Sequence, residues 1–473
     1  MVSIWMNRYH FYMYKRILTV DKKKYEIDMV NGPILKKMLL FTIPLMCSSI
    51  LQLLFNAADI VVVGHFAGDN SLAAVGSNTA LINLMTNVFL GLSVGGNVLA
   101  ARDYGAGNDE ELSRTVHTAM MLSLISGVIL TIVGVIFAPQ LLKLMQTPDN
   151  ILPLASLYLR IYFLGMTAMM IYNFGSALLR SVGDTKRPLY YLMTAGIINV
   201  ILNMIFVIVL DMDVAGVGLA TVISQCISAF LVLRCMMREQ GGIRLIPGKL
   251  RIYKEKLIQI VCVGLPAGFQ GAVFSLSNVV IQSSVNIFGE IVVAGNSAAM
   301  NLEGFVYVAM NAFHQAAISF TSQNVGAGKR ERIGKILLTA EGCVIATGIV
   351  FGWVMYGFGR PLLHIYSGST EVIEAGMVRM AIILFPYALC GMMDVVVGVL
   401  RGMGYSVGPM FISLIGACGL RLIWIATVFQ IPQFHKISTV YLSYPITWTI
   451  TFLAQLCLYI YARTKMKKEN GPL

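Results

Sequence analysis

The stretch Arg180-Ser-Val-Gly183-Asp-Thr-Lys-Arg-Pro188 occurs a second time as Arg401-Gly-Met-Gly404-Tyr-Ser-Val-Gly-Pro409. The arginine, the glycine and the proline all recur at a shift of 221 residues. We expect both arginines to end membrane-spanning helices, where their long side chains reach lipid headgroups and cap helix carbonyls. A repeat at this distance predicts that the chain is a duplication of one unit, about half of its 473 residues long.

Two further segments support the duplication. Tyr104-Gly-Ala-Gly-Asn108 returns as Val325-Gly-Ala-Gly-Lys329 at the same shift, and Phe55-Asn-Ala-Ala-Asp59 aligns with Phe274-Ser-Leu-Ser-Asn278 at a shift of 219. The glycines of the first pair predict tight turns where helices end. In a membrane protein, such a duplication is typical of transporters whose binding site lies between the two units.

The composition places the chain in a membrane. Hydrophobic residues make up 57% of the chain and charged residues 12%, whereas soluble domains contain roughly 25% charged residues. The mean hydropathy is +0.75. A spanning helix needs about 20 mostly apolar residues. The segments that meet this requirement are 38–66, 73–101, 115–138, 154–179, 189–210, 215–236, 257–284, 292–321, 336–359, 372–400, 410–431 and 441–462.

Six spans in each half give the two halves the same orientation. The sequence therefore predicts an all-α integral membrane protein of twelve transmembrane helices, arranged as two parallel six-helix repeats with a pseudo-twofold axis along the membrane normal. We divide it into a cytoplasmic N-terminal extension (1–28), a first six-helix lobe (29–236), a basic cytoplasmic linker (237–256) and a second lobe with a basic tail (257–473).

The distribution of charge predicts the orientation. The formal net charge is +12, and most of the 35 lysines and arginines share one side of the membrane when both termini are cytoplasmic. Because basic loops favour the cytoplasm, we expect a multi-pass protein of a bacterial cell membrane with both termini inside. The basic surplus then faces anionic membrane lipids, and we expect no nucleic acid partner.

The motifs do not indicate an enzyme. The eight cysteines form no Cys-x-x-Cys pair, and the sequence contains neither a phosphate-binding loop nor a cluster of metal ligands. The cysteines lie in or beside hydrophobic segments and are interpreted as small apolar core residues. We therefore expect no enzymatic activity and no cofactor.

Asp59 is the clearest candidate for function. It lies in the first span, about 10 Å from the outer end at 1.5 Å per residue, among apolar neighbours. Burial disfavours the ionised form of a carboxylate, so such a group can take up a proton. It can also bind a sodium ion or a cationic substrate, and the three would compete for one site. The alternative is an aspartate that only holds helices together by hydrogen bonds.

Asn199 and Asn203 are the next candidates for ion coupling. A spacing of four residues places them on one face of the fifth span, and Asn203 lies about 11 Å from the outer end, close to Asp59 in depth. Their amides could coordinate an ion or hydrogen-bond a carboxylate. Asparagine also joins helices in membranes without any role in transport.

The second half carries three deep charged residues. Asp394 aligns with Asn173 of the first half, and Arg421 lies near the middle of the eleventh span. These two form either a structural ion pair or part of a cavity involved in coupling. Glu303 is either a second protonatable site or a member of a satisfied polar cluster. We expect Arg379, near the start of the tenth span, to extend outward to water.

Further polar residues within the spans are candidates for lining a substrate cavity. Methionines beside several of them would suit a cavity that accepts many shapes, although they are also ordinary packing residues. The remaining cavity candidates are Gln52, Asn83, Asn87, Asn173, Gln270 and Asn278.

Several of these segments resemble those of a known family. Ala58-Asp59-Ile-Val-Val-Val-Gly64, followed by Leu72-Ala-Ala-Val-Gly76, resembles the first-helix signature of the multidrug and toxic compound extrusion (MATE) transporters. The repeated arginine motifs and Gly264-Leu-Pro266 resemble further motifs of that family, and the resemblance covers roughly residues 31–465. It implies a secondary antiporter that exports organic cations or drugs in exchange for H⁺ or Na⁺ by alternating access.

The resemblance also implies which residues couple ions. The first-helix carboxylate of the family falls on Asp59, and its fifth-helix Asn-x-x-x-Asp motif falls on Asn199 and Asn203, so the second carboxylate is absent here. Some relatives carry a glutamate in the seventh helix, where this chain has Gln270 and Asn278 but no acid. These departures favour protons over a sodium ion near Asp59.

Two alternatives remain open at this point. A flippase for lipid-linked precursors would be expected to present several basic residues in its cavity, and a channel or sensory membrane protein is a weaker candidate. The sequence does not name a substrate. We expect small cationic or amphipathic substrates, contact with membrane lipids and a monomeric protein.

Overall fold

The computed structural model describes residues 25–468, and its main elements are helices. They are α2 (Ile34–Phe66), α3 (Asp69–Gly105), α4 (Asp109–Leu144), α5 (Leu152–Leu164), α6 (Met166–Ser181), α7 (Lys186–Asn203), α8 (Asp213–Arg238), α9 (Lys254–Asn286), α10 (Glu290–Gly326), α11 (Arg332–Gly357), α12 (Gly359–His364), α13 (Thr370–Leu384), α14 (Ala388–Gly402), α15 (Val407–Ser413), α16 (Leu420–Ala426) and α17 (Ile437–Lys468). Two π-helical turns, η1 (Met204–Val209) and η4 (Leu414–Gly419), continue α7 and α15.

Ten helical segments of the described chain are long and apolar enough to cross a membrane singly. Two more spans are bent pairs, α5 with α6 at 47° and α13 with α14 at 45°, so the predicted twelve spans are present when each pair counts as one. The bends occupy equivalent places in the repeat, because Gly165 aligns with Pro386 at the shift of 221. Glycine and proline both weaken a helix, by flexibility and by loss of a main-chain donor respectively.

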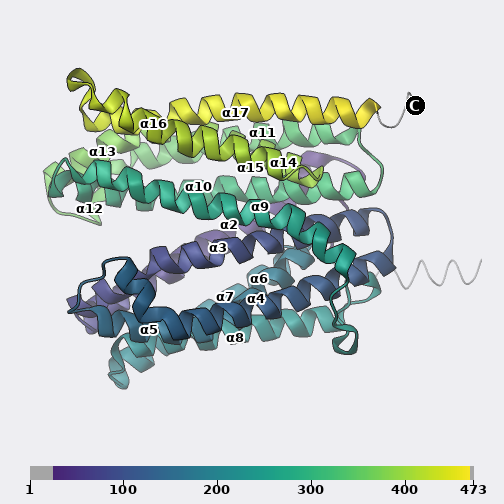
Figure 1. The fold of residues 1–473 in the computed structure, drawn as a ribbon, viewed down its shortest axis with the longest axis horizontal. Coiled ribbons are helices and arrows are strands. Elements are labelled where there is room, and N and C mark those ends of the chain that lie inside the picture. The colour runs from purple at the N-terminus through teal and green to yellow at the C-terminus, as the bar shows by residue number, and fades with distance from the viewer. Residues whose placement is uncertain (1–24, 469–473) are drawn as a thin grey trace, which may run out of the picture.

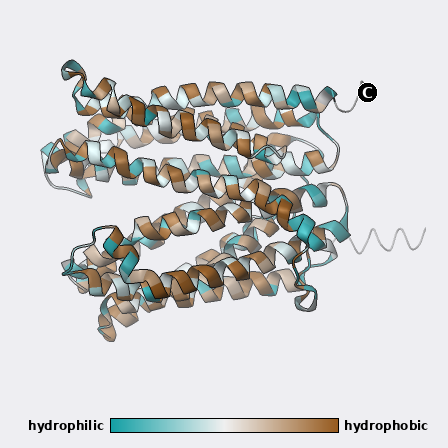
Figure 2. Cartoon of the chain, in the orientation of Figure 1, coloured by the Kyte–Doolittle hydropathy of each residue, from teal (hydrophilic) through white to brown (hydrophobic). Residues whose placement is uncertain are grey.

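The two halves of the chain form two groups of helices. Helices α4 to α8 lie on one side of the molecule and α10 to α17 on the other, with α2, α3 and α9 between them (Figure 1). Apolar residues cover most of the length of the helices, and hydrophilic residues gather at their ends (Figure 2). Exposed side chains such as Ile136, Leu338 and Val350 belong to this apolar surface, which suits contact with lipid.

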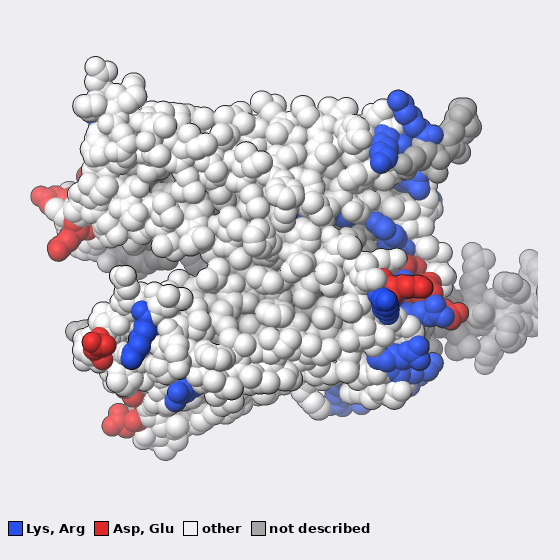
Figure 3. All heavy atoms as spheres, viewed as in Figure 1, with Lys and Arg blue, Asp and Glu red and all other residues white. Residues whose placement is uncertain are grey.

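The molecule has a basic end and an acidic end. Lysine and arginine gather where α3 and α10 finish, whereas aspartate and glutamate predominate where α10 and α13 begin (Figure 3). A notch separates the two groups of helices at the acidic end, and they are in contact towards the basic end (Figure 3).

The two halves meet reciprocally at the basic end. A β-carbon built on Gly105 would lie 2.1 Å from the carbonyl oxygen of Gln323, and one on Gly326 would lie 2.0 Å from that of Arg102. A shift of 221 residues converts each of these contacts into the other, as expected for two halves related by a pseudo-twofold axis. The turns themselves depend on Gly107 and the equivalent glycine at 328, with φ of 69° and 72°.

The repeated arginine motif also contains a turn that requires glycine. Gly183 and Gly404 have φ of 94° and 97°, which side chains with a β-carbon rarely adopt. In the first copy, Asp184 accepts hydrogen bonds from the main-chain N–H groups of Lys186 and Arg187 at 3.2 and 3.1 Å, at the start of α7. Burial raises the pKa of Asp184 even though the Arg187 guanidinium opposes this shift.

Residues 25–33 form an N-terminal strap across the basic end. The hydroxyl of Tyr104 in α3 donates to Glu26 at 2.8 Å, whereas Asn324 in α10 donates to the carbonyl of Met29 at 3.0 Å. Met29 is fully buried. In the described part of the predicted N-terminal extension, residues 25–28, Glu26 contacts α3 and Ile27 packs against a core made mainly of second-half residues. Residues 1–24 lie outside the described residues.

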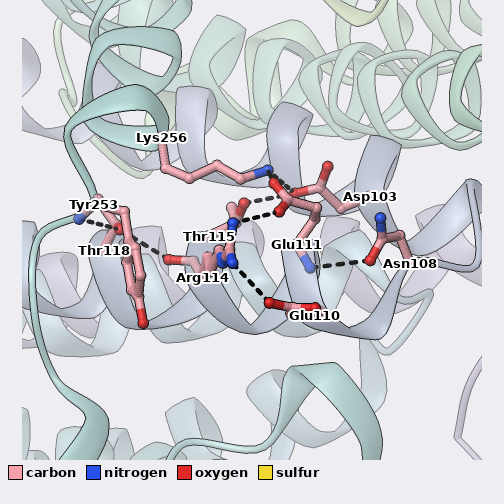
Figure 4. A network of polar contacts seen from close by, with 9 residues as sticks. All are labelled: Asp103, Asn108, Glu110, Glu111, Arg114, Thr115, Thr118, Tyr253 and Lys256. Carbon is pink, nitrogen blue, oxygen red and sulfur yellow. Dashed lines mark hydrogen bonds and ion pairs between the residues drawn. The ribbon is translucent and has the colours of Figure 1, made fainter.

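The predicted basic linker is a second strap, held against the first half (Figure 4). Lys256, at the start of α9, lies 2.8 Å from Asp103 and 3.0 Å from Glu111, and the main-chain N–H of Tyr253 donates to Thr118 at 3.2 Å. Asp103 is equivalent to Asn324 under the shift of 221. Asp103 of the first half thus holds the segment that leads into α9, the first helix of the second half. The equivalent Asn324 of the second half holds the segment that leads into α2, the first helix of the first half.

Glycines allow α3 and α9 to pack with their backbones in contact. A β-carbon on Gly268 would lie 2.3 Å from the carbonyl oxygen of Val88, whereas one on Gly271 would lie no closer than 3.6 Å to Asn87. We expect Gly268→Ala to lower stability by about 1–3 kcal/mol through overpacking. Gly271→Ala is the matched control and should leave the apparent melting temperature of the detergent-purified protein unchanged. Equal melting temperatures for both variants would contradict this packing.

Candidate functional site

Asp59 lies at the contact between α2 and α7. Its Oδ1 accepts a hydrogen bond from the Nδ2 of Asn203, the last residue of α7. The same Nδ2 approaches Oδ1 of Asn199 at 3.3 Å, and Asn199 donates to Thr221 of α8 at 3.5 Å. The three residues proposed for ion coupling therefore form one chain of contacts that joins α2, α7 and α8.

The local sequence brings these helices together. A β-carbon on Gly196 would lie 1.8 Å from the ring of Phe55, so only glycine allows α2 to approach α7 this closely. Gly196, Asn199 and Asn203 follow at spacings of three and four residues and share one face of the helix. Phe55 precedes Asp59 by four residues and lies on the same face of α2.

The surroundings of Asp59 are polar but hold no balancing cation. Asp59 is half-buried, Asn199 is 5% exposed and Asn203 is 1% exposed. None of the ion pairs within residues 25–468 includes Asp59. A carboxylate in this setting is available to a proton or to an external cation.

The groups linked to Asp59 are the amides of Asn203 and Asn199 and the hydroxyl of Thr221. The described residues contain no group of three or more histidine, cysteine, aspartate or glutamate side chains that could hold a metal ion. Asn203 presents its N–H to the carboxylate, which stabilises a negative charge there and directs the amide oxygen away. A sodium site here would have to rely on one carboxylate and neutral oxygens.

Glu303 belongs to a buried ion pair in the second half. Both of its carboxylate oxygens accept from Arg379, at 2.8 and 2.7 Å, and Arg379 also donates to Asn296 at 2.9 Å. Arg379 is 3% exposed, so the expectation that it extends outward to water is wrong. Residues of α10 and the rings of Tyr441 and Tyr444 in α17 surround it. The satisfied-cluster interpretation of Glu303 fits this geometry.

Arg421 and Asp394 do not form the ion pair considered from the sequence. No ion pair within residues 25–468 joins them. The guanidinium of Arg421 lies 3.9 Å from the ring centre of Tyr444 and donates to Thr447 at 3.3 Å. Asp394 is half-buried, and its main-chain carbonyl interacts with His314 at 2.6 Å.

Arg401 is also buried, which overturns the expectation that it reaches lipid headgroups. It is 6% exposed and donates to Gln270 of α9 at 2.8 Å. The side-chain oxygen of Gln270 thus accepts a hydrogen bond from a residue of its own half. The equivalent Arg180 remains partly exposed.

The other polar candidates do not converge on one point. Asn87 donates to Ser275 at 3.3 Å, which links α3 to α9, and Asn173 donates to the carbonyl of Met169 within its own helix at 2.8 Å. Exposed side chains are found for Gln52, Asn83 and Asn278. No hydrogen bond within the described residues joins these three to Asp59.

Arg379, Asn296 and Tyr444 were not among the site residues expected from the sequence. Arg379 aligns with Tyr158 under the shift of 221, so the two halves differ in charge at this position. A lone Glu303 in a span requires a counter-charge, and this requirement was the available signal for Arg379. Tyr444 gave no comparable signal, because aromatic residues are common in any apolar helix.

Two six-span repeats, a notch between them and a carboxylate held by an amide in one repeat define a membrane transport protein rather than an enzyme. A family model described as MatE matches residues 44–205 and 266–427, more than half of the chain. The chain therefore belongs to the MATE family, a family of membrane transporters. The two matched regions correspond to the two halves of the repeat.

Similar proteins agree with this assignment. The probable multidrug resistance protein YoeA of Bacillus subtilis is 27% identical over 445 residues, which cover 92% of this chain and 95% of YoeA. The probable multidrug resistance protein YpnP of the same organism is 28% identical over 396 residues, 83% and 88% of the two chains. A structure of the outward-facing conformation of a multidrug resistance MATE family transporter has a TM-score of 0.86 at 21% identity, over 94% of this chain and 98% of that one. This last likeness concerns the fold alone.

Proposed function

We propose that this protein is a secondary antiporter that exports organic cations or drugs in exchange for protons by alternating access. The observation that carries the proposal is the half-buried Asp59, which accepts a hydrogen bond from Asn203 and has no basic partner among the described residues. The names of YoeA and YpnP as probable multidrug resistance proteins support the substrate class. The protein acts as a monomer in a bacterial cell membrane, with both termini in the cytoplasm.

Ionised Asp59 is the cation-binding form in this mechanism. The N–H of Asn203 stabilises the carboxylate while a cationic substrate supplies the opposite charge. A proton arriving from outside removes the negative charge and weakens the attraction for the substrate. Proton and substrate therefore compete for one group, which is the thermodynamic requirement for exchange.

The shape of the molecule corresponds to one of the two states that alternating access requires. If the basic end faces the cytoplasm, the notch opens outward and the inner end is closed. Contacts between the halves there include Ser319 to Asn97 at 3.3 Å and Gln323 to the carbonyl of Ser181 at 2.7 Å. These contacts must separate when the halves rock to open the inner end.

Protons are favoured over sodium as the coupling ion. Asn203 replaces the second carboxylate implied by the family resemblance, so Asp59 has only neutral oxygens beside it. The lipid flippase alternative has less support, because Arg379 is paired with Glu303 and Arg401 is hydrogen-bonded to Gln270, so Arg421 alone of these three would be left for a phosphate-rich headgroup.

Transport in proteoliposomes tests the proposal. We expect ethidium to move against its gradient when a pH gradient is imposed, and not when a sodium gradient of equal size is imposed at constant pH. Protein-free liposomes give the leak rate. Ethidium movement that follows the sodium gradient alone would contradict proton coupling, and movement under neither gradient would contradict antiport of this cation.

A further inference from the structure

The second half contains a buried cation without a matching anion. Arg421 is 5% exposed and follows the π-helical turn η4, at the start of α16. Its described contacts are the ring of Tyr444 at 3.9 Å and the hydroxyl of Thr447 at 3.3 Å. Its Nε is buried and has no hydrogen-bond partner. Both protein contacts are neutral, so the charge of Arg421 is not balanced by a side chain.

The nearby carboxylate is already used. Arg379 lies 5.5 Å from the same Tyr444 ring centre, so two guanidinium groups are neighbours around one aromatic side chain. Both oxygens of Glu303 accept from Arg379, and no ion pair within the described residues joins Glu303 to Arg421. Asp394 does not lie within ion-pair distance of any basic residue in the described chain. Around the Tyr444 ring, two cations and one paired anion leave one positive charge.

An unbalanced buried charge is costly, and an anionic ligand would remove this cost. Removal from water penalises a guanidinium by several kcal/mol unless an anion and hydrogen bonds compensate. A guanidinium presents a planar set of N–H donors that matches a carboxylate. In Arg421 the Nε has no hydrogen-bond partner, and the contact to Thr447 can be exchanged for one to a ligand, so donors remain available. A single positive charge suits a monoanion better than a phosphate. The ring of Tyr444 supplies an apolar surface beside it.

We propose that Arg421 binds the carboxylate of an amphipathic substrate in the second half. The proposal rests on the proposed transport function and extends it, because it adds carboxylate-bearing zwitterions to the cations that Asp59 would select. The two halves then recognise opposite charges: Asp59 in the first and Arg421 in the second.

Two dyes that differ only in the carboxyl group provide the test. Rhodamine 110 carries a carboxylate, and rhodamine 123 is its methyl ester. We would measure the Kd of both dyes by fluorescence anisotropy on detergent-purified wild-type protein, Arg421→Met and Arg421→Lys. Arg238→Met removes the same charge from an exposed position at the end of α8 and is the control.

A loss of one charge-assisted contact should weaken binding by about ten-fold or more. We expect Arg421→Met to raise the Kd of rhodamine 110 by this factor while the Kd of rhodamine 123 changes less than two-fold. Arg421→Lys should keep most of the preference for the acid, and Arg238→Met should keep all of it. If Arg421→Met is not monodisperse, Arg421→Gln takes its place, since it removes the charge but keeps a polar side chain.

Three results would overturn the proposal. They are equal losses for acid and ester in Arg421→Met, no change for either dye, and wild-type protein that does not bind rhodamine 110. The measurement needs no ion gradient. Failure of proton-driven transport in liposomes therefore leaves the binding result intact, and the two proposals can fail separately.

Discussion

Asp59→Asn is expected to reduce the pH-driven component of ethidium transport strongly while leaving the protein folded. Asparagine keeps the size of the side chain and can still bond to Asn203, but it cannot take up a proton or carry a negative charge. Coupling free energies between two ligands are typically 1–3 kcal/mol, so we expect a loss of roughly 5- to 150-fold. Proteoliposomes with an imposed pH gradient give the rate.

Two variants control this experiment. Glu290→Gln neutralises an exposed acid at the start of α10 and should transport at the wild-type rate. Asp59→Glu retains the titratable group and should retain part of the gradient response, which a purely structural role for Asp59 does not predict. If Asp59→Asn responds to the pH gradient as wild type does, another group carries the proton and the proposed mechanism is wrong.

The repeat in the sequence was sufficient to predict the architecture. Recurrence at 221 residues and twelve apolar segments predicted two parallel six-span halves, which the structure and the MatE match confirm. The bends were not predicted, because Gly165 and Pro386 are different residues and glycine within an apolar segment is not a specific signal.

Depth along a helix predicted one part of the candidate site but not the other. Asp59 and Asn203 were placed at similar depths from the outer ends of their spans, and they are hydrogen-bonded. Arg379 was assigned to the outer end of a span, whereas neighbouring helices enclose it. The sequence position of a residue gives its height in the membrane, but pairing depends on which helices become neighbours. That information is long-range, and the pattern of apolar residues does not contain it.

Glu303→Met is expected to destabilise the protein by about 3–5 kcal/mol, because it leaves Arg379 buried without its carboxylate. The double variant Glu303→Met with Arg379→Met removes both charges and should recover most of that loss, since apolar side chains of similar size can replace a buried pair. The measurement is the apparent melting temperature of each variant purified in detergent. Arg360 and Glu374 provide a matched control, because their pair has a similar N–O distance of 3.0 Å but side chains that are 67% and 51% exposed.

Glu374→Met should cost no more than about 1 kcal/mol, as is usual for an exposed pair. A similar small effect of Glu303→Met would mean that the buried pair does not stabilise the fold. Transport by the double variant then separates the two interpretations of Glu303. If the pair only maintains the packing of α10 against α13, the double variant transports ethidium at close to the wild-type rate, because Asp59 still exchanges the proton. If Glu303 is a second proton carrier, the double variant regains stability but loses transport, and these two outcomes cannot both occur in one protein.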